Sequence, residues 1–291
     1  MRVGIDSYSY HRRYGEIRSG EVVPAAGPAW PLVPSPALAH ARTTGADEIW
    51  LETCYLPEPE TIDAATFAER GSLGIGFSWG HPWPEGAFHG LDGGRTPAAE
   101  DHLARWIALA ARLGHPVMRI TLGSPASRGT EPAAVLIDRL IAPAARAADR
   151  AAAAGIRLAI ENHGDLRAQD LLEILARVGS PHLGITLDNV NLVRVGDDML
   201  EGSRMLAPRT LLVQLKDHPP TPDPTVWGGP LSVALGEGVA PLGEIVAILE
   251  GAGYDGPVAV ELASLGGADV DELAMIERSV RWLRANLPER Y

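Results

Sequence analysis

Several apolar segments of this 291-residue chain end in a carboxylate or an amide. Residues 157–160 have the pattern of a buried strand and run directly into Glu161. Three later segments of the same kind end in Asp188, Gln214 and Glu261. Side chains of these types supply only oxygen ligands, which favour hard divalent cations such as Mg²⁺ or Mn²⁺ over zinc. The four residues are therefore predicted to hold one divalent metal ion, with Co²⁺ as a further option.

The charge of these residues supports the same interpretation. Three carboxylates that converge without a counter-ion repel one another and raise their own pKa values. A doubly charged cation neutralises most of this charge and leaves coordination positions for substrate oxygens. The alternative is that each residue is separately salt-bridged or caps a helix, but four such ends on successive strands favour a common site.

The elements that must position these residues follow from the hydrophobic pattern. Strands are predicted at 2–5, 48–51, 74–78, 117–121, 157–160, 183–187, 211–213 and 258–260. Helices are predicted at 36–44, 59–70, 132–154, 168–178, 197–206 and 242–250, with one more from the N-cap Thr96 to Gly114. A last helix is predicted to open with Asp269 and Glu272 in capping-box spacing.

Eight strands that alternate with helices predict a parallel sheet that is covered on its faces. In a chain without a composition break, this indicates an α/β fold, a single-domain (β/α)8 TIM barrel over residues 1–291. The alternative is an open doubly wound sheet, but the first strand-to-helix turn lacks a glycine phosphate fingerprint. In a barrel the carboxyl ends of the strands form one face, so the four predicted ligands meet there.

The composition excludes several classes of protein. A formal net charge of −12 disfavours nucleic-acid binding, which needs a basic face. No apolar run approaches the roughly 20 residues that span a bilayer, and no signal-peptide pattern opens the chain. The single cysteine, Cys54, excludes an intramolecular disulfide framework and is typical of a reducing compartment. We therefore expect a cytoplasmic protein that acts on a small molecule.

Several short runs resemble those of a known family. The runs Ile-Glu-Asn-His, Leu-Asp-Asn and Gln-Leu-Lys-Asp, and Gly-Glu-Gly ahead of Tyr-Asp-Gly-Pro and Val-Glu, resemble the sugar phosphate isomerase/epimerase family of xylose-isomerase-like TIM barrels. The resemblance covers essentially the whole chain and is most specific from Arg157 to Glu261. It implies a metal held by the four residues above, enolisation next to a carbonyl, and assembly as a homodimer or homotetramer.

The chain departs from this family at two positions. Many members carry histidine where this chain has Gln214. At this position the chain resembles hydroxypyruvate isomerases and some 3-dehydroshikimate dehydratases, which carry a glutamine there. Ketose 3-epimerases of the family carry histidine where this chain has Asn191. The second departure weakens an assignment as a ketose epimerase.

Enolisation requires groups that move protons next to a polarised carbonyl. Glu161 and Glu261 lie on well-separated strands, and we expect one to take the proton and the other to return it. His163 is predicted to act as a base or to orient a substrate hydroxyl, or alternatively to support the metal site. Lys216 is predicted to bind substrate oxygens or to stabilise the enolate, with a counter-charge to Asp217 as its alternative.

Other polar and aromatic residues are predicted to contact the substrate, namely His81, Asn191, His218 and Trp227. For His81, which follows the third strand, ordinary packing is the alternative. Trp227 lies in the loop 219–238, where an indole can cover the apolar C–H face of a sugar, although core packing explains a tryptophan equally well.

These residues predict a metal-dependent isomerase or epimerase of carbohydrate metabolism, acting on a small sugar or hydroxy-keto compound through an enediolate. A dehydratase of the 3-dehydroshikimate or keto-inositol type is the alternative, because both reactions begin with the same proton removal. A non-catalytic sugar-binding barrel is a third possibility. The substrate, either a sugar or a keto-acid, is not specified by the sequence.

Overall fold

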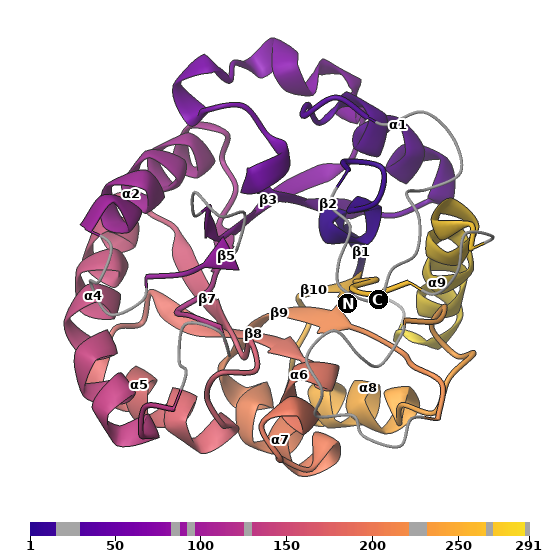
Figure 1. Ribbon diagram of the computed structural model, residues 1–291. Helices are drawn as coiled ribbons and strands as arrows, with labels where there is room; N and C mark the ends of the chain where they lie inside the picture. Colours follow the sequence, from indigo (N-terminus) through magenta and orange to yellow (C-terminus); the bar gives the residue numbers. More distant parts are fainter. Residues whose placement is uncertain are drawn as a thin grey trace.

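Parallel strands close into a barrel in the computed structural model, which describes residues 1–15, 30–82, 88–91, 97–124, 130–220, 232–265 and 270–288 (Figure 1). The order around the barrel is β1-β10-β9-β8-β7-β6-β3-β2. The strands are β1 (Arg2–Asp6), β2 (Glu48–Glu52), β3 (Gly74–Trp79), β6 (Val117–Ile120), β7 (Arg157–Glu161), β8 (Leu183–Asp188), β9 (Thr210–Leu215) and β10 (Pro257–Val260). Because β1 pairs with both β2 and β10, the sheet has no free edge, and the predicted TIM barrel is confirmed.

Helices cover the outside of the barrel (Figure 1). They are α1 (Ser35–Thr44), α2 (Pro97–Arg112), α4 (Ala133–Ala153), α5 (Ala168–Val178), α6 (Asn189–Arg194), α7 (Met199–Leu206), α8 (Leu242–Gly251) and α9 (Glu272–Asn286). Short 3₁₀ turns are η1 (Ser7–Tyr10), η2 (Thr53–Tyr55), η3 (Pro59–Thr61), η4 (Ala64–Arg70) and η6 (Ala207–Arg209), and β4 (His81–Pro82) pairs with β5 (Phe88–His89). Among the described residues, no helix combines the length and apolarity needed to cross a bilayer.

Two predicted elements differ from the observed ones, and one predicted N-cap is not tested. The helix predicted at 59–70 is instead the two 3₁₀ turns η3 and η4, because extended Asp63 starts a new turn by accepting a hydrogen bond from the Thr66 N–H. The last helix is capped by Asp271, whose side chain accepts from Leu273 and Ala274, whereas Asp269 lies outside the described residues. The N-cap predicted at Thr96 also lies outside them.

The interior of the barrel is filled by one large side chain among small ones. Trp50 is fully buried, and it forms an apolar cluster with Val117, Ala159, Leu212 and Ala259. Space for its indole comes from Gly76 on the neighbouring strand, where a Cβ atom would lie only 2.5 Å from the Trp50 ring. The barrel is thus packed solid at this level and has no axial channel through it.

Candidate active site

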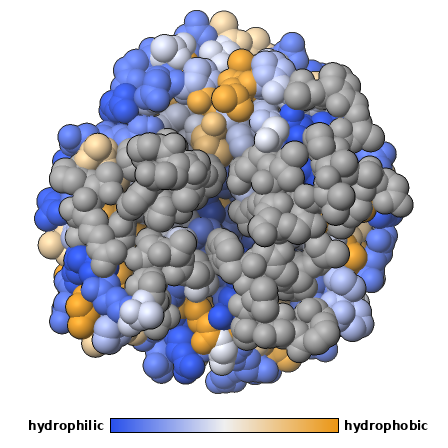
Figure 2. Space-filling view, viewed as in Figure 1, coloured by the Kyte–Doolittle hydropathy of each residue, from blue (hydrophilic) through white to orange (hydrophobic). Residues whose placement is uncertain are grey.

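The layer of side chains that follows this apolar cluster is polar. Side chains two positions apart on a strand share a face, so the residues two positions after the cluster also point into the barrel, nearer its carboxyl end. These residues are Glu52, Arg119, Glu161, Gln214 and Glu261, and all are buried. Figure 2 shows this face of the molecule hollowed at its centre, with hydrophilic residues visible there. This polar layer is the candidate site.

Three of the predicted ligands meet here, namely Glu161 and Glu261 of the polar layer and Asp188, which pairs with Gln214 of that layer in the strand register. Glu161 ends β7, Asp188 ends β8, and Glu261 directly follows β10, where its N–H donates to the Leu215 carbonyl at 3.0 Å. One carboxylate oxygen from each of the three residues lies within 4.8 Å of the other two. Such spacing allows all three oxygens to contact one cation.

Gln214, the fourth predicted ligand, lies beside Asp188 in the strand register. Its amide nitrogen donates to Asp6 Oδ2 at 2.9 Å, while its oxygen Oε1 is buried and accepts no hydrogen bond from the described residues. A buried amide oxygen without a partner is costly, and a metal ion would satisfy it. The donor set therefore fits a hard divalent cation.

Two asparagines hold the strand ends in place. The Asn162 side chain, directly after β7, accepts from the Asp188 N–H at 2.8 Å and donates to the Asp188 carbonyl at 2.7 Å. The Asn189 side chain, directly after β8, makes the same pair of bonds to the backbone of Lys216, both at 2.9 Å. Each asparagine thus fixes the backbone of a charged site residue at the carboxyl end of the next strand.

The sequence analysis considered carboxylates without a counter-ion, but in the structure two basic side chains pair with them. Lys216 Nζ lies 2.6 Å from Asp188 Oδ2 and 2.8 Å from Glu261 Oε1. Burial alone would lower the pKa of Lys216, but the carboxylates of Asp188 and Glu261 raise it above its ordinary value. Arg119 pairs with Glu52 at 3.2 Å and also with Glu161. A metal ion bound by Asp188 and Glu261 would compete with Lys216 for Asp188 Oδ2 and Glu261 Oε1.

Lys216 is the single lysine among the 25 lysine and arginine residues of the chain. Its compact ammonium group is a point charge on a flexible stem, whereas the guanidinium of Arg119, which pairs with Glu52 and Glu161, is a planar fork. The alternative prediction, in which Lys216 balances Asp217, is wrong. Asp217 instead accepts backbone N–H bonds from His218, Gly236, Gly238 and Ala240 and so holds the segment after β9.

Two further buried carboxylates belong to the site although the sequence analysis did not include them. Asp6 ends β1, and burial, followed by the charge of Glu261, raises its pKa to about 7. Glu52 ends β2, and burial raises its pKa well above the ordinary value although Arg119 opposes the shift. Both directly follow predicted strands, so the same signal that identified Glu161 points to them.

The predicted ligands themselves titrate unusually. Burial raises the pKa of Asp188 to about 6, with Lys216 opposing the shift and Glu261 adding to it. Burial also raises the pKa of Glu161, against the lowering effect of Arg119. Carboxyl groups with raised pKa values exchange protons more readily near neutral pH than ordinary ones.

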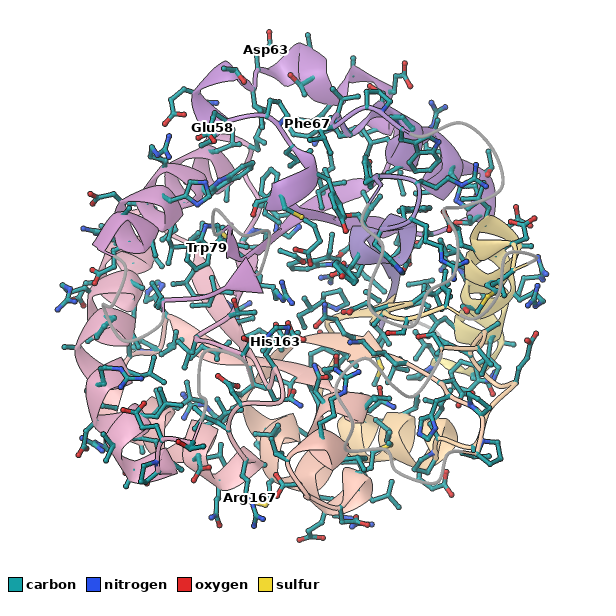
Figure 3. The ribbon with its side chains drawn as sticks, viewed as in Figure 1. Glu58, Asp63, Phe67, Trp79, His163 and Arg167 are labelled. Carbon is teal, nitrogen blue, oxygen red and sulfur yellow. The ribbon has the colours of Figure 1, made fainter. Side chains whose placement is uncertain are left out.

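Asn191 contacts two of the carboxylates, and His163 lies near the barrel axis. The Asn191 amide nitrogen donates to Glu161 Oε1 at 3.0 Å and to Asp188 Oδ2 at 2.9 Å, so it bridges two predicted ligands. His163 lies close to the axis of the barrel (Figure 3), and its Nδ1 donates to the Gly123 carbonyl at 2.9 Å. In a neutral ring this bond leaves the lone pair on Nε2.

The other predicted substrate contacts are only partly placed. His218 is buried, and its Nδ1 donates to the Pro219 carbonyl at 2.9 Å. Trp227 and the side chain of His81 lie outside what the structure describes. Trp79 is fully buried, and its indole N–H donates to His102 on α2 at 2.9 Å, so this tryptophan packs outward against a helix (Figure 3).

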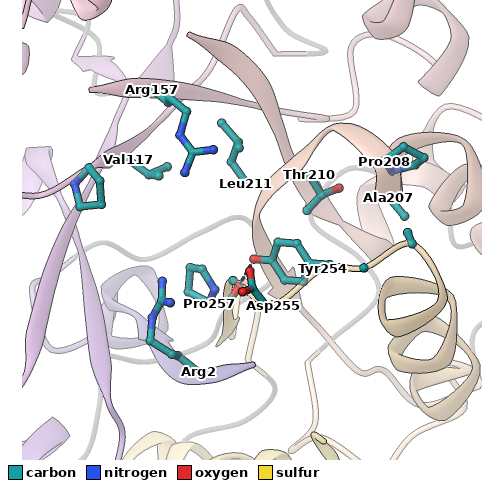
Figure 4. Close-up of a pocket in the computed structure, with 14 residues that line it drawn as sticks. Arg2, Val117, Arg157, Ala207, Pro208, Thr210, Leu211, Tyr254, Asp255 and Pro257 are labelled. Carbon is teal, nitrogen blue, oxygen red and sulfur yellow. Dashed lines mark hydrogen bonds between the residues drawn. The ribbon is translucent and has the colours of Figure 1, made fainter. Parts of the chain in front are cut away.

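A separate cavity of about 340 Å³ lies near the amino ends of the strands (Figure 4). Arg2 and Arg157 begin β1 and β7 and line it together with Tyr254 and Asp255. Its charges largely balance, because Arg2 pairs with Glu48 and Asp255 carries the opposite charge to Arg157. The apolar cluster around Trp50 separates this cavity from the carboxylates of the candidate site, so the two are distinct.

Comparison with known proteins decides the family. The sequence profile of the xylose isomerase-like TIM barrel family matches residues 57–286, which is most of the chain. The chain belongs to this family. The matched segment contains Glu161, Asp188, Gln214 and Glu261.

Individual relatives of this xylose isomerase-like protein are distant. The structure of L-ribulose 3-epimerase superimposes with a TM-score of 0.72 at 20% identity and covers 98% of this chain and 94% of that chain. The structure of the IolI protein with a bound zinc atom superimposes with a TM-score of 0.71 at 14% identity and covers 97% of this chain and 96% of that chain. The 3-oxo-isoapionate decarboxylase of Pectobacterium atrosepticum is 27% identical over 127 residues, which is 44% of this chain and 44% of that protein.

At these identities the superpositions show a shared fold, and the decarboxylase match spans less than half of either chain. The chemistry of this family member therefore depends on its own residues. Arg119 lies inside the apolar run Val-Met-Arg-Ile, and this local pattern does not indicate that its side chain pairs with two acids of the site.

Proposed function

We propose that this protein is a divalent-metal-dependent isomerase or epimerase of a small sugar or hydroxy-keto compound. The observation that supports it is the convergence of Glu161, Asp188 and Glu261 within 4.8 Å, beside a buried Gln214 oxygen that accepts no hydrogen bond from the described residues. The metal would be held by these four residues. When bound, it supplies Lewis-acid polarisation of a substrate carbonyl.

The remaining steps fall to the protein's own side chains. Glu161 and Glu261 come from β7 and from the end of β10, which two other strands separate. One takes the proton from the carbon next to the carbonyl, and the other returns a proton to the substrate. The raised pKa of Glu161 suits this role, because burial brings its protonated form closer to neutral pH.

Positively charged and neutral donors complete the proposed mechanism. Lys216, once displaced from Asp188 and Glu261, donates to the enediolate oxygen and stabilises its charge. His163 accepts or donates a proton at a substrate hydroxyl through Nε2, the nitrogen that carries the lone pair when Nδ1 binds Gly123. Asn191 holds Glu161 and Asp188 in a fixed arrangement.

A lyase is the second candidate, and a specific observation favours it. The partial match to 3-oxo-isoapionate decarboxylase spans 127 residues, and that protein is named for loss of carbon dioxide. A dehydratase would use the same first proton transfer and then protonate and expel a hydroxyl group as water. A decarboxylase would use the same carbonyl polarisation to lose carbon dioxide, and a side chain would then deliver a proton to the enolate carbon.

The decisive experiment incubates the protein with Mn²⁺ and a panel of sugars, ketoses and hydroxy-keto acids in D2O, followed by NMR and mass spectrometry. An isomerase gives deuterium at the carbon next to the carbonyl and a product of the same composition. A product that has lost water or carbon dioxide identifies the lyase. Binding without turnover for the whole panel would leave only a sugar-binding barrel.

Metal dependence is tested separately, by metal analysis after dialysis against EDTA and by re-addition of Mn²⁺, Mg²⁺, Co²⁺ or Zn²⁺. Zinc is included because the IolI structure contains it. Glu161→Gln and Glu261→Gln should each abolish turnover, since an amide cannot accept the proton. Glu250→Gln, an exposed change on α8, is the matched control.

A further inference from the structure

A glutamine ligand presents two chemically different ends. The amide oxygen has lone pairs for a metal ion, whereas the amide nitrogen has only hydrogens. Rotation of the terminal amide exchanges the two ends at little intrinsic cost, because this torsion is broad and roughly two-fold. Gln214 therefore needs a neighbour that fixes which end faces the acidic cluster.

Asp6 is placed to do this. Its carboxylate is fully buried at the end of β1, and both of its oxygens already accept hydrogen bonds. Oδ1 accepts from the Tyr8 N–H at 2.8 Å, and Oδ2 accepts from the Ser78 hydroxyl at 3.0 Å and from Gln214 Nε2 at 2.9 Å. An ionised carboxylate offers only acceptor oxygens, so only the nitrogen end of Gln214 can face the Asp6 carboxylate.

The geometry points to Asp6 as the positioning residue that holds Gln214 with Oε1 turned toward the metal ion. This inference rests on the proposed function, because it assigns a role to Gln214 within that metal site. It explains why the amide oxygen is left buried and without a hydrogen bond in the described part of the chain. Mutation of a group that orients a metal ligand from behind typically lowers metal affinity by about 10–100-fold.

The variant Asp6→Asn has nearly the same shape but reverses the hydrogen-bond pattern. Tyr8 N–H still requires an acceptor, so the new amide places its nitrogen toward Ser78 and Gln214. Gln214 then turns its oxygen toward position 6 and its nitrogen toward the carboxylates. We expect the Kd for Mn²⁺ to rise by about 10–100-fold in calorimetric titration and in electron paramagnetic resonance of free Mn²⁺.

Loss of the Asp6 charge would weaken cation binding even without any reorientation, so a double-mutant cycle with Gln214→Ala separates the two effects. If Asp6 acts through the amide, Asp6→Asn causes no further loss of affinity once Gln214→Ala is present. An equal loss in both backgrounds would mean that Asp6 acts only through its charge, and would overturn the inference. An unchanged Kd for Asp6→Asn would also overturn it.

Two controls complete the design. Ser78→Ala removes a donor to Asp6 but leaves the bond to Gln214, so its effect should be smaller than that of Asp6→Asn. If Asp6→Asn does not fold, Asp6→Ala enters the same cycle and is judged by the same comparison. A wild-type protein that binds no divalent cation would overturn the proposed metal dependence together with this inference, whereas wild-type binding with an unchanged variant overturns the inference alone.

Discussion

At the scale of single residues, the site is a buried charge cluster in which acids outnumber bases. The carboxylates are Asp6, Glu52, Glu161, Asp188 and Glu261, and the cations that pair with them are Arg119 and Lys216. Removing this many acids from water is costly unless each is paired or protonated. Burial is the main cause of the raised pKa values of Asp6 and Asp188, and the negative charge of Glu261 adds to the shift. An additional cation would oppose it.

Lys216→Met tests this balance, because it keeps the length of the side chain and removes its charge. Breaking a buried ion pair from one side typically costs about 3–5 kcal/mol, so the metal-free variant should be less stable than the wild type. Mn²⁺ no longer competes with an ammonium group for Asp188 and Glu261, so Mn²⁺ should raise the melting temperature more in the variant. Thermal unfolding in EDTA and in Mn²⁺ measures both effects.

Lys216→Arg serves as the matched control, because it retains the charge but not the compact shape. We expect it to recover only part of the metal-free stability, since a planar guanidinium is larger than the ammonium group that contacts both carboxylates. If Mn²⁺ stabilises Lys216→Met less than the wild type, Lys216 assists cation binding and does not compete with it.

At the scale of elements, the predicted strands and the observed ones agree because each apolar segment is short and ends in polar residues. Glu161, Asp188 and Glu261 were found because each directly follows such a segment. Asp6 and Glu52 carry the same signal, but they lie outside the segment from Arg157 to Glu261, where the resemblance to the family is most specific. Strand-end acids in the first half of the chain were therefore left unassigned.

Other features could not be predicted from the sequence because they depend on contacts between distant strands. The pairing of Gln214 with Asp6 joins residues 208 positions apart. The Lys216 ion pairs depend on the position of β9 between β8 and β10. The local sequence pattern indicates to which face of the sheet a side chain points, whereas the partner of that side chain depends on the tertiary arrangement.

The asparagine clamps give a prediction at this scale. Asn189→Ala removes both bonds to the Lys216 backbone and leaves one buried N–H and one buried carbonyl without these partners. Each such group costs about 1–3 kcal/mol, so chemical denaturation should show a clearly lower free energy of unfolding. Asn286→Ala, at an exposed asparagine near the end of α9, should change it little. Equal stability of the two variants would mean that the clamp does not hold β9.

At the scale of the whole molecule, the proposed ligands are unevenly distributed around the barrel. All four come from adjacent strands, β7 to β10, while β2, β3 and β6 contribute the Glu52, Ser78 and Arg119 side chains that surround them. A bound cation would therefore tie together one half of a closed sheet. The strands on the other side would gain stability only through their pairing with that half.

Metal binding should accordingly stabilise the barrel as a whole and protect one half more strongly. At a free Mn²⁺ concentration one hundred times Kd, linkage gives about 2.7 kcal/mol, or roughly 5 °C in melting temperature for a chain of this size. Hydrogen–deuterium exchange with and without Mn²⁺ should show the largest slowing in β7 to β10. Glu161→Gln/Asp188→Asn, which removes two ligand charges, should lose this protection. Slowing that is strongest in β2 and β3, or that persists in the double variant, would place the cation elsewhere.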